Sequence, residues 1–161
     1  DGKIILKNDV TKKEDYATFK LPYSMEKEEP VYWNRLLDRL YSPEERRKIE
    51  YAIGAVIAGE SVNLQKFFIF VGDAGTGKST ILGIIDEMFR GYTSSINIES
   101  IGMGKDFALE SLSDNPLIAI QDDVELDHIT ENARLNSIIS HETLTVNEKH
   151  KKLYQAKFRT M

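Results

Sequence analysis

The segment 72–79, which reads Gly-Asp-Ala-Gly-Thr-Gly-Lys-Ser, constrains the fold of this chain more than any other feature of the sequence. It satisfies the pattern GxxxxGK[ST], in which a glycine-rich loop joins the end of a strand to the start of a helix. The flanking residues fit that placement, because the short apolar run 67–71 precedes the loop and apolar residues at helical spacing follow it over 78–89. The sequence therefore predicts a buried strand, a loop and a helix in direct succession.

This loop is predicted to hold the phosphates of a nucleotide. Glycine at 72, 75 and 77 permits positive φ angles and a close approach of backbone N–H groups to phosphate oxygens at the start of a helix. Lys78 would add a positive charge between the β- and γ-phosphates, and the Ser79 hydroxyl would bind Mg²⁺, which prefers oxygen ligands. The predicted ATP-binding residues are consecutive, and they are Gly72, Asp73, Ala74, Gly75, Thr76, Gly77, Lys78, Ser79 and Thr80. The alternative is a glycine-rich turn that matches the pattern by accident.

Two adjacent aspartates follow a second apolar run, at residues 117–120, and are the predicted partners of the loop. In open α/β sheets ligands bind at the carboxyl ends of the strands, so both aspartates are expected on the same side as the phosphates. Asp122 is predicted to hold the magnesium ion through water, and Asp123 to polarise the water that attacks ATP. Lys78, Asp122 and Asp123 are thus the candidate catalytic residues, and Ser79 and Asp122 the candidate metal ligands. The alternative is a pair of solvated loop acids.

A basic segment near the end of the sequence is predicted to form a hairpin that binds DNA. Residues 143–146 alternate as a strand does, and residues 153–158 can return as a second strand. The turn between them carries the candidate DNA-binding residues Lys149, His150, Lys151 and Lys152. Residues 147–161 hold five of the 21 basic side chains and one of the 26 acidic ones, although the whole chain has a net charge of −5. The composition leaves open the alternative that these lysines form an ordinary solvated face.

The sequence divides into a lead-in, a helical part and a core. Residues 1–30 are polar and mixed in charge, and are predicted to be a lead-in from a preceding region. Residues 31–62 are predicted to be helical, and their second helix begins at Ser42-Pro43-Glu44-Glu45, where the serine caps the helix and a glutamate closes a capping box. Residues 63–161 form the predicted core. Further elements are predicted at 95–98 (strand), 105–112 (helix) and 130–140 (helix).

The composition excludes several classes of protein. The chain has no cysteine, which removes disulfide frameworks, iron–sulfur clusters and thiol nucleophiles and makes a reducing cytoplasm the expected compartment. Its three histidines, His128, His141 and His150, lack an HExxH spacing, so no zinc site is expected. No apolar run approaches the roughly 20 residues that span a bilayer, so no membrane partner is expected. The sequence begins at Asp1 without a methionine or a leader, and is interpreted as a fragment.

The order of these motifs resembles the superfamily III helicases, which are AAA+-like motors. The phosphate loop (GDAGTGKST), the apolar strand that ends in two acids, a helix and the basic hairpin follow one another at short spacing. Within that superfamily the chain looks most like the C-terminal helicase domain of phage and plasmid primases, which is related to the poxvirus-type primase-helicases. The likeness extends to the start of the sequence (DGKIIL) and to residues 31–58. It implies an α/β fold with a P-loop parallel sheet flanked by helices, an N-terminal helical segment and a C-terminal β-hairpin, truncated in this fragment.

The resemblance implies a role in DNA replication. Relatives of this kind form hexameric rings, hydrolyse ATP at the subunit interfaces and translocate on single-stranded DNA, with the hairpin facing the central channel. By position, the phosphate-binding role belongs to the loop 72–80 and the acidic role to the pair 122–123. The channel role belongs to the turn 149–152. The resemblance also implies a sensor asparagine and an arginine finger beyond Met161, so the fragment alone is expected to be weakly active.

This sequence departs from those relatives at two places. Many relatives have glutamate where this chain has Asp123, so Glu125 is an alternative for the water-orienting role. Relatives often have glycine followed by an acid where this chain has His141-Glu142, which makes the alignment of the hairpin approximate.

Two other classes of protein share the phosphate loop. A small-molecule P-loop kinase would need an acceptor pocket and an arginine-rich lid, and only Arg90, Arg134 and Arg159 follow the loop. A nucleotide-dependent assembly module would bind ATP as a structural ligand. Stimulation of ATP hydrolysis by single-stranded DNA would separate the helicase from both alternatives.

Overall fold

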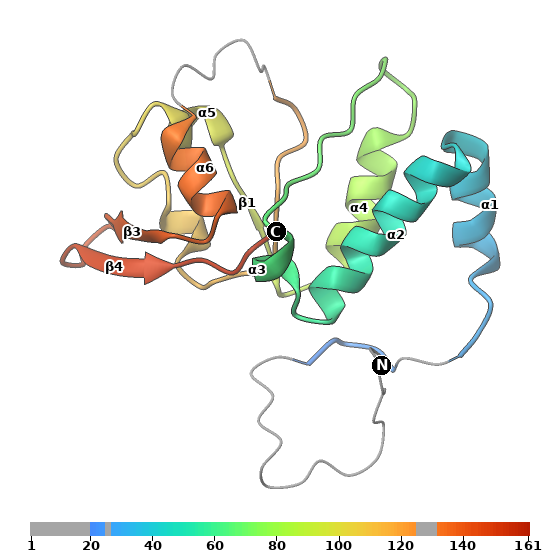
Figure 1. Cartoon of the computed structure of the whole chain (residues 1–161), viewed down its shortest axis with the longest axis horizontal. Helices are drawn as coiled ribbons and strands as arrows, with labels where there is room; N and C mark the ends of the chain where they lie inside the picture. The colour runs from blue at the N-terminus through green and yellow to red at the C-terminus, as the bar shows by residue number, and fades with distance from the viewer. Residues whose placement is uncertain (1–19, 25–26, 125–131) are drawn as a thin grey trace, which may run out of the picture. The chain divides into compact units, whose positions relative to one another are not determined.

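The structure is a computed structural model that describes residues 20–24, 27–124 and 132–161. The chain divides into two compact units, residues 1–50 and 51–161, and Figure 1 shows the elements of both in chain order. The division falls within the helix α2 (Pro43–Ile57). The predicted boundaries after residues 30 and 62 stay predictions. Within the described ranges, no helix is both long and apolar enough to cross a lipid bilayer.

The first unit contains α1 (Val31–Leu40) and the beginning of α2. The predicted capping box at the start of α2 is confirmed, because the backbone N–H and the hydroxyl of Ser42 donate to Glu45 Oε2 at 2.8 and 2.7 Å. The N–H of Glu45 donates back to Ser42 Oγ at 3.3 Å. The guanidinium of Arg46 in α2 pairs with Asp38 in α1 at 2.5 Å, so an ion pair also joins the two helices.

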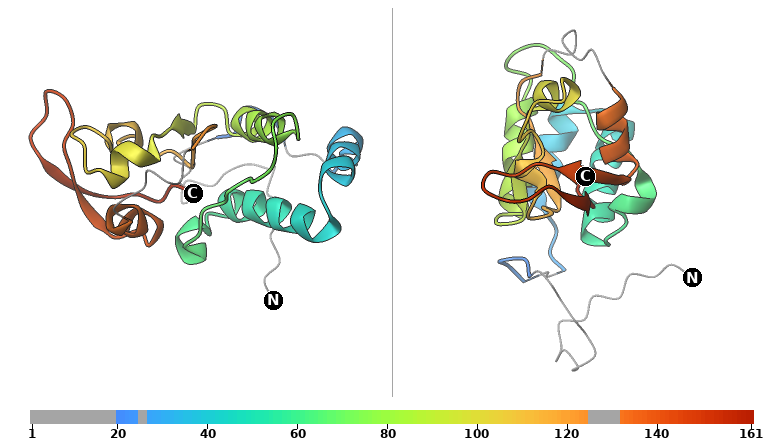
Figure 2. Two further views of the ribbon diagram at one scale, coloured as in Figure 1. Left: turned by 90° about the horizontal axis from the view of Figure 1, so that it is seen from above. Right: turned by 90° about the vertical axis from the view of Figure 1, so that its left-hand side faces the viewer.

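The second unit contains all three candidate functional segments. Its elements after α2 are α3 (Ser61–Leu64), α4 (Lys78–Met88), β1 (Thr93–Ser95), α5 (Ile98–Gly102), the 3₁₀ helix η1 (Glu110–Leu112), β2 (Ile118–Ile120), α6 (Ala133–Ile139), β3 (Thr143–Val146) and β4 (Tyr154–Lys157). β1 pairs with β2 in parallel, and β3 pairs with β4 antiparallel. Figure 2 shows the β3–β4 hairpin from two further directions, with α6 packed beside it.

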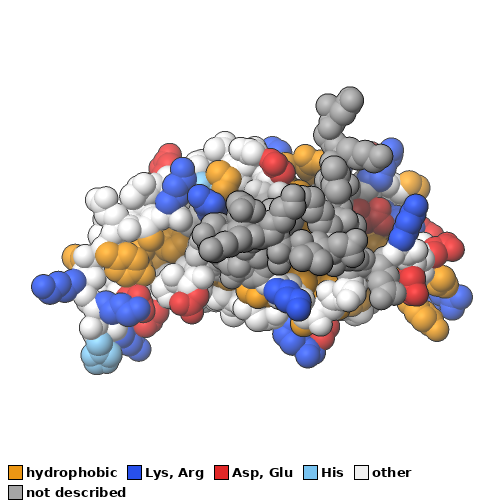
Figure 3. Space-filling model, turned by 90° about the horizontal axis from the view of Figure 1, so that it is seen from below, with side chains coloured by type: hydrophobic (Ala, Val, Ile, Leu, Met, Phe, Trp, Pro, Cys, Tyr) orange, Lys and Arg blue, Asp and Glu red, His pale blue; other side chains and the backbone are white. Residues whose placement is uncertain are grey.

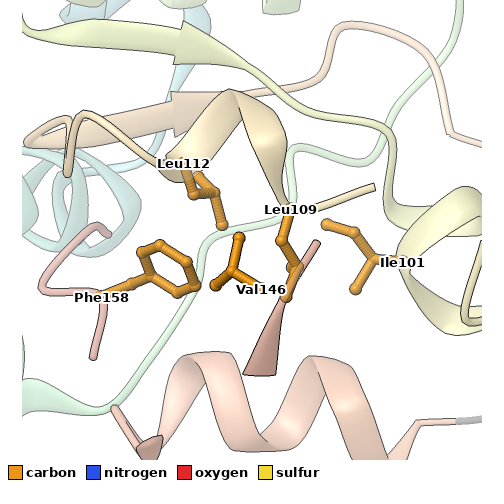
Figure 4. Packing of buried hydrophobic residues seen from close by; sticks show 5 residues of the cluster. All are labelled: Ile101, Leu109, Leu112, Val146 and Phe158. Atoms are coloured by element: carbon orange, nitrogen blue, oxygen red, sulfur yellow. The ribbon is translucent and has the colours of Figure 1, made fainter. Parts of the chain in front are cut away.

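A cluster of buried apolar side chains joins the hairpin to the rest of this unit. Its members come from α5, from η1 and the residue before it, from β3 and from the segment after β4, and they are Ile101, Leu109, Leu112, Val146 and Phe158 (Figure 4). Each is at most 2% exposed. Because full burial of one such side chain contributes about 1.5–3 kcal/mol, the cluster anchors the base of the hairpin, whereas the turn at 149–152 is exposed.

Most of the predicted helices and the hairpin are confirmed. The helices α1, α2 and α4 lie at the predicted positions, and β2 is the predicted second apolar strand. β3 and β4 form the predicted hairpin, with Val146 opposite Tyr154. The helix α6 lies inside the predicted range 130–140, of which residues 130 and 131 fall outside the described residues.

The helix predicted at 105–112 is wrong. This stretch forms turns and the short η1, and a helix is found earlier in the chain, at α5. Phe107 has a φ of 63°, in the left-handed region, so a right-handed helix cannot continue through it. The apolar spacing of the stretch instead places Leu109 and Leu112 in the core cluster.

The strand predicted at 95–98 is confirmed only at its start, since β1 ends at Ser95. The side chain of Asn97 caps α5, because its Oδ1 accepts a hydrogen bond from the N–H of Ser100 at 2.6 Å. An asparagine in that position starts a helix rather than continuing a strand.

The buried strand predicted at 67–71 is wrong in this structure. These residues carry no strand assignment, and four of the five are between 38% and 86% exposed. Burial of a parallel strand requires neighbouring strands and covering helices. Here β2 pairs with β1 on one edge, and on its other edge Met161 exchanges backbone hydrogen bonds with Leu117 and Ala119. The parallel sheet of the described residues is the β1–β2 pair, and the wider P-loop sheet stays a prediction.

Candidate nucleotide site and basic hairpin

The glycine-rich loop runs from the segment 67–71 into the first turn of α4. Gly75 and Gly77 have φ angles of 79° and 88°, which residues with a side chain rarely adopt. Gly77 is the N-cap of α4, so the loop closes onto the unpaired N–H groups at the start of that helix. The hydroxyl of Thr76 donates to the carbonyl oxygen of Asp73 at 2.8 Å and ties the loop together. Such conformations are those that a phosphate-binding loop requires.

Lys78 is folded back over this loop. Its ammonium donates to the carbonyl oxygens of Gly72 and Asp73 at 2.7 and 2.8 Å. The positive charge is therefore held at the N-terminus of α4, where the helix dipole also favours an anion. The first turn of the helix leaves Ser79 and Thr80 exposed, so two hydroxyls lie beside the loop.

The aspartate pair follows the carboxyl end of β2. Asp122 and Asp123 are both exposed, and α4 contacts β2. In Figure 1 the loop and the residues after β2 lie toward the same end of the second unit. Among the described residues, no hydrogen bond or ion pair joins either aspartate to Lys78 or Ser79. Glu125, the alternative acid, lies outside the described residues.

The side chains available to a metal ion are oxygen donors. In the part of the chain that the structure describes, no group of three or more histidine, aspartate or glutamate side chains gathers as a metal site. The Ser79 hydroxyl and the Asp122 carboxylate belong to the ligand types that Mg²⁺ prefers, and this ion normally keeps several waters and phosphate oxygens. The donors fit an ion that binds together with a nucleotide.

The turn of the hairpin exposes its basic side chains. Lys149, His150, Lys151 and Lys152 are all exposed. Figure 3 shows lysine and histidine side chains gathered at one end of the surface, with acidic side chains beside them. Within the turn, the carboxylate of Glu148 pairs with Lys151 at 2.5 Å. The turn is therefore basic on balance but not uniformly so.

This ion pair shifts two pKa values. The hydrogen bond from Lys151, together with the hydrogen bond that the Tyr154 hydroxyl donates at 3.1 Å, holds the pKa of Glu148 below its ordinary value. The same carboxylate raises the pKa of Lys151. Glu148 thus offsets the charge of one of the three turn lysines.

A second segment contacts the hairpin, and the sequence does not reveal it. The ammonium of Lys149 lies 5.8 Å from the centre of the Phe107 ring, within cation–π range. Next to it, Asp106 accepts a hydrogen bond from the Asn147 side chain at 3.3 Å. Phe107 is 37% exposed. No local signal could have identified this contact, because the apolar spacing of residues 105–112 predicts a regular helix.

An open pocket of about 780 Å³ lies beside this segment. The end of β1, the start of α5 and the loop before η1 line it, and its side chains include Asn97, Lys105, Phe107 and Gln121. No residue of the loop 72–80 lines this pocket, so the pocket is separate from the glycine-rich loop.

The described residues thus define an α/β protein with a glycine-rich loop at the start of a helix and a basic hairpin in the same unit. Residues 70–161 match the model of a protein family that is described as "Family of unknown function (DUF5906)". The chain belongs to this family, and the matched range contains the glycine-rich loop, the aspartate pair and the hairpin.

The A form apo structure of the C-terminal region (CTR) of NrS-1 is similar to this chain, with a TM-score of 0.66 and 26% sequence identity. The similarity covers 83% of this chain and 32% of that chain, so the present chain spans about a third of the NrS-1 region. No curated protein matches the sequence. The similarity to NrS-1 therefore extends over most of this chain, beyond the range that the family match covers.

Proposed function

We propose that this chain is the ATP-binding part of an ATP-dependent DNA helicase of the replicative primase-helicase type. The observation that carries the proposal is the loop at the start of α4, in which Gly75 and Gly77 adopt left-handed conformations and Lys78 folds over the loop. The similarity to the C-terminal region of NrS-1 over 83% of this chain supports a shared fold. The order of the motifs, which resembles the superfamily III helicases, supports the proposal further.

In this proposal the phosphates of ATP draw the Lys78 ammonium away from the carbonyl oxygens of Gly72 and Asp73. An anionic phosphate oxygen attracts the ammonium more strongly than a neutral carbonyl oxygen does, so phosphate oxygens compete well for Lys78. The backbone N–H groups of the loop then surround the phosphates. Ser79 and Asp122 would hold Mg²⁺, which neutralises charge on the phosphates during phosphoryl transfer.

Asp123 orients the water that attacks ATP. The water oxygen forms a bond to the γ-phosphorus, the bond from that phosphorus to the bridging oxygen breaks, and ADP leaves with the electron pair. The proton released by the water passes to the carboxylate and then to solvent. ADP and inorganic phosphate are the products, and hydrolysis drives translocation.

Single-stranded DNA binds at the hairpin turn. Lys149 and Lys152 meet backbone phosphates, while the exposed face of Phe107 beside Lys149 offers a surface on which a base can stack. Stacking on an aromatic side chain contributes about 1–3 kcal/mol per base and tolerates any sequence. The working assembly is a homo-hexamer in the cytoplasm, in which the turns of six copies face the DNA.

Hydrolysis of ATP with and without single-stranded DNA tests this proposal. The expected result is release of inorganic phosphate that requires Mg²⁺ and that oligodeoxythymidylate accelerates. A matched sample with EDTA in place of Mg²⁺ is the control. Phosphate transfer to a small acceptor, without stimulation by DNA, would favour the small-molecule kinase. ATP binding without turnover would favour the assembly module.

A further inference from the structure

At the end of the parallel pairing of β1 with β2, a side chain replaces a backbone carbonyl as the hydrogen-bond acceptor. Beyond the paired residues, the N–H of Ile96 donates to the carbonyl oxygen of Ile120 at 3.1 Å. In a parallel ladder the next donor on this edge is two residues on, at Ile98, and its partner is the carbonyl of residue 122. Instead, the N–H of Ile98 donates to the side-chain oxygen of Gln121 at 2.7 Å. Gln121 therefore takes the place of a backbone carbonyl in the ladder.

The nitrogen of the same amide bonds to the backbone of the aspartate pair. Gln121 Nε2 donates to the carbonyl oxygen of Asp123 at 2.9 Å. Because the amide replaces the carbonyl of Asp122 in the ladder, the chain leaves the sheet here, and both carboxylates are exposed. One half-buried side chain thus joins the backbone of Asp123 to the first residue of α5.

We propose that Gln121 is a positioning residue that holds Asp123 in the orientation required for ATP hydrolysis. This inference rests on the proposed function, in which Asp123 orients the attacking water. Gln121 acts only through the backbone of Asp123. A group that orients water acts mainly in the transition state, so its displacement lowers kcat and leaves the affinity for nucleotide unchanged.

Two substitutions separate the two hydrogen bonds of Gln121. Gln121→Met keeps the length of the side chain and removes both bonds. Gln121→Glu keeps an oxygen that can accept from Ile98, but it replaces the amide donor with a carboxylate oxygen that repels the carbonyl of Asp123. Asn97→Ala is the matched control, because it removes the cap of α5 at Ser100 and none of the bonds to Asp123.

Both Gln121 variants are expected to lower kcat for ATP at least about tenfold, because small displacements of a reacting group cost a large part of the rate. KM and the affinity for a non-hydrolysable ATP analogue should stay within about twofold, since uniform binding is unaffected. Asn97→Ala should leave kcat unchanged. A merely structural role for Gln121 would instead lower thermal stability and leave the kcat of the folded fraction at the wild-type value.

Hydrogen–deuterium exchange on the same proteins reports whether the Ile98 amide keeps its hydrogen bond. In Gln121→Met the Ile98 amide should lose protection, whereas in Gln121→Glu it should keep it. If Gln121→Met hydrolyses ATP at the wild-type kcat, the positioning role is overturned while the proposed function stands. If the wild-type protein binds ATP but never hydrolyses it, the proposed function and the positioning role are both overturned.

Discussion

Nε2 of His141 lies 3.1 Å from the carbonyl oxygen of Ser61, a residue 80 positions earlier in the chain. Nδ1 of the same ring lies 2.8 Å from the carbonyl oxygen of Phe158. His141 as a whole residue is 3% exposed. It therefore joins α3, the turn before β3 and the segment after β4 at one buried point, and it adopts a φ of 54° to do so.

His141→Ala is expected to destabilise the protein by about 1–3 kcal/mol, because it removes the N–H that the ring donates to a buried carbonyl oxygen and leaves that oxygen without a donor. His141→Gly loses the same contacts but removes the cost of about 1–2 kcal/mol that a side chain pays in the left-handed region. The glycine variant should therefore be the more stable of the two. Urea unfolding of the three proteins measures this order. An alanine variant as stable as the wild type would show that the two contacts contribute nothing.

The capping box of α2 should depend on pH. Hydrogen bonds from Ser42 hold the pKa of Glu45 below its ordinary value of 4.5. A carboxylate with a lowered pKa contributes stability above its unfolded pKa and loses it as pH falls through the folded pKa. Ser42→Ala should cost about 1 kcal/mol at pH 7, and the difference from wild type should shrink at pH 3.

Unfolding measured by circular dichroism at the two pH values provides the comparison. Ser42→Thr, which keeps a hydroxyl at the N-cap, is the control and should stay close to wild type at both. If the difference in free energy of unfolding between wild type and Ser42→Ala is as large at pH 3 as at pH 7, the Glu45 carboxylate does not contribute to the cap.

Lys78→Ala should weaken the binding of ATP with Mg²⁺ while the protein stays folded. The substitution removes the charge that is expected to meet the β- and γ-phosphates, and a charge-assisted contact of this kind contributes enough to lower affinity by about tenfold or more. Lys66→Ala removes an exposed lysine outside the loop and is the matched control. Calorimetric titration measures the affinity of both variants and of the wild type for ATP. Equal affinity in wild type and Lys78→Ala would exclude the loop as a phosphate site.

Asp122→Asn and Asp123→Asn should separate binding from turnover. Metal placement and water orientation act mainly in the transition state, so each variant should bind ATP nearly as wild type and hydrolyse it at a small fraction of the wild-type rate. Asp114→Asn neutralises an exposed acid outside the pair and should change neither quantity. Full turnover in both variants of the pair would remove these acids from the mechanism, and Glu125 would be tested next.

The elements that the sequence predicts correctly are those whose residues interact with near neighbours. Ser42 and Glu45 are three residues apart, and the capping box that they form needs nothing from the rest of the chain. The β3–β4 hairpin is similar, since a short turn brings Val146 opposite Tyr154. For the candidate site, the sequence predicts the loop, the aspartate pair and the basic turn as separate segments.

The features that the sequence does not predict depend on distant partners. The segment 67–71 has the composition of a buried strand, but burial depends on which strands lie beside it. Phe107 lies in a loop instead of the predicted helix. This loop contacts Lys149 and Asn147 in another part of the chain. In the sequence Gln121 is an ordinary polar residue. Its two hydrogen bonds form only because β1 and β2 are paired.

The lysines of the hairpin turn should bind DNA through its phosphates. Replacement of Lys149, Lys151 and Lys152 by alanine is expected to weaken single-stranded DNA binding for all sequences alike. Each lost phosphate contact should reduce the slope of log affinity against log salt by about 0.7. Stimulation of ATP hydrolysis by DNA should fall in parallel, while ATP binding without DNA stays unchanged. Lys157→Ala, on β4 and away from the turn, is the matched control.

Glu148→Gln should have the opposite effect on DNA binding. Glu148 pairs with Lys151, so its neutralisation frees that lysine for phosphate, strengthens DNA binding and steepens the salt dependence. The two changes of opposite sign distinguish a phosphate contact from a general loss of folding, which could only weaken binding. The plots of log affinity for single-stranded DNA against log salt could coincide for the triple alanine variant, Glu148→Gln and wild type. In that case the lysines form a solvated face, and the small-molecule kinase becomes the leading explanation of the glycine-rich loop.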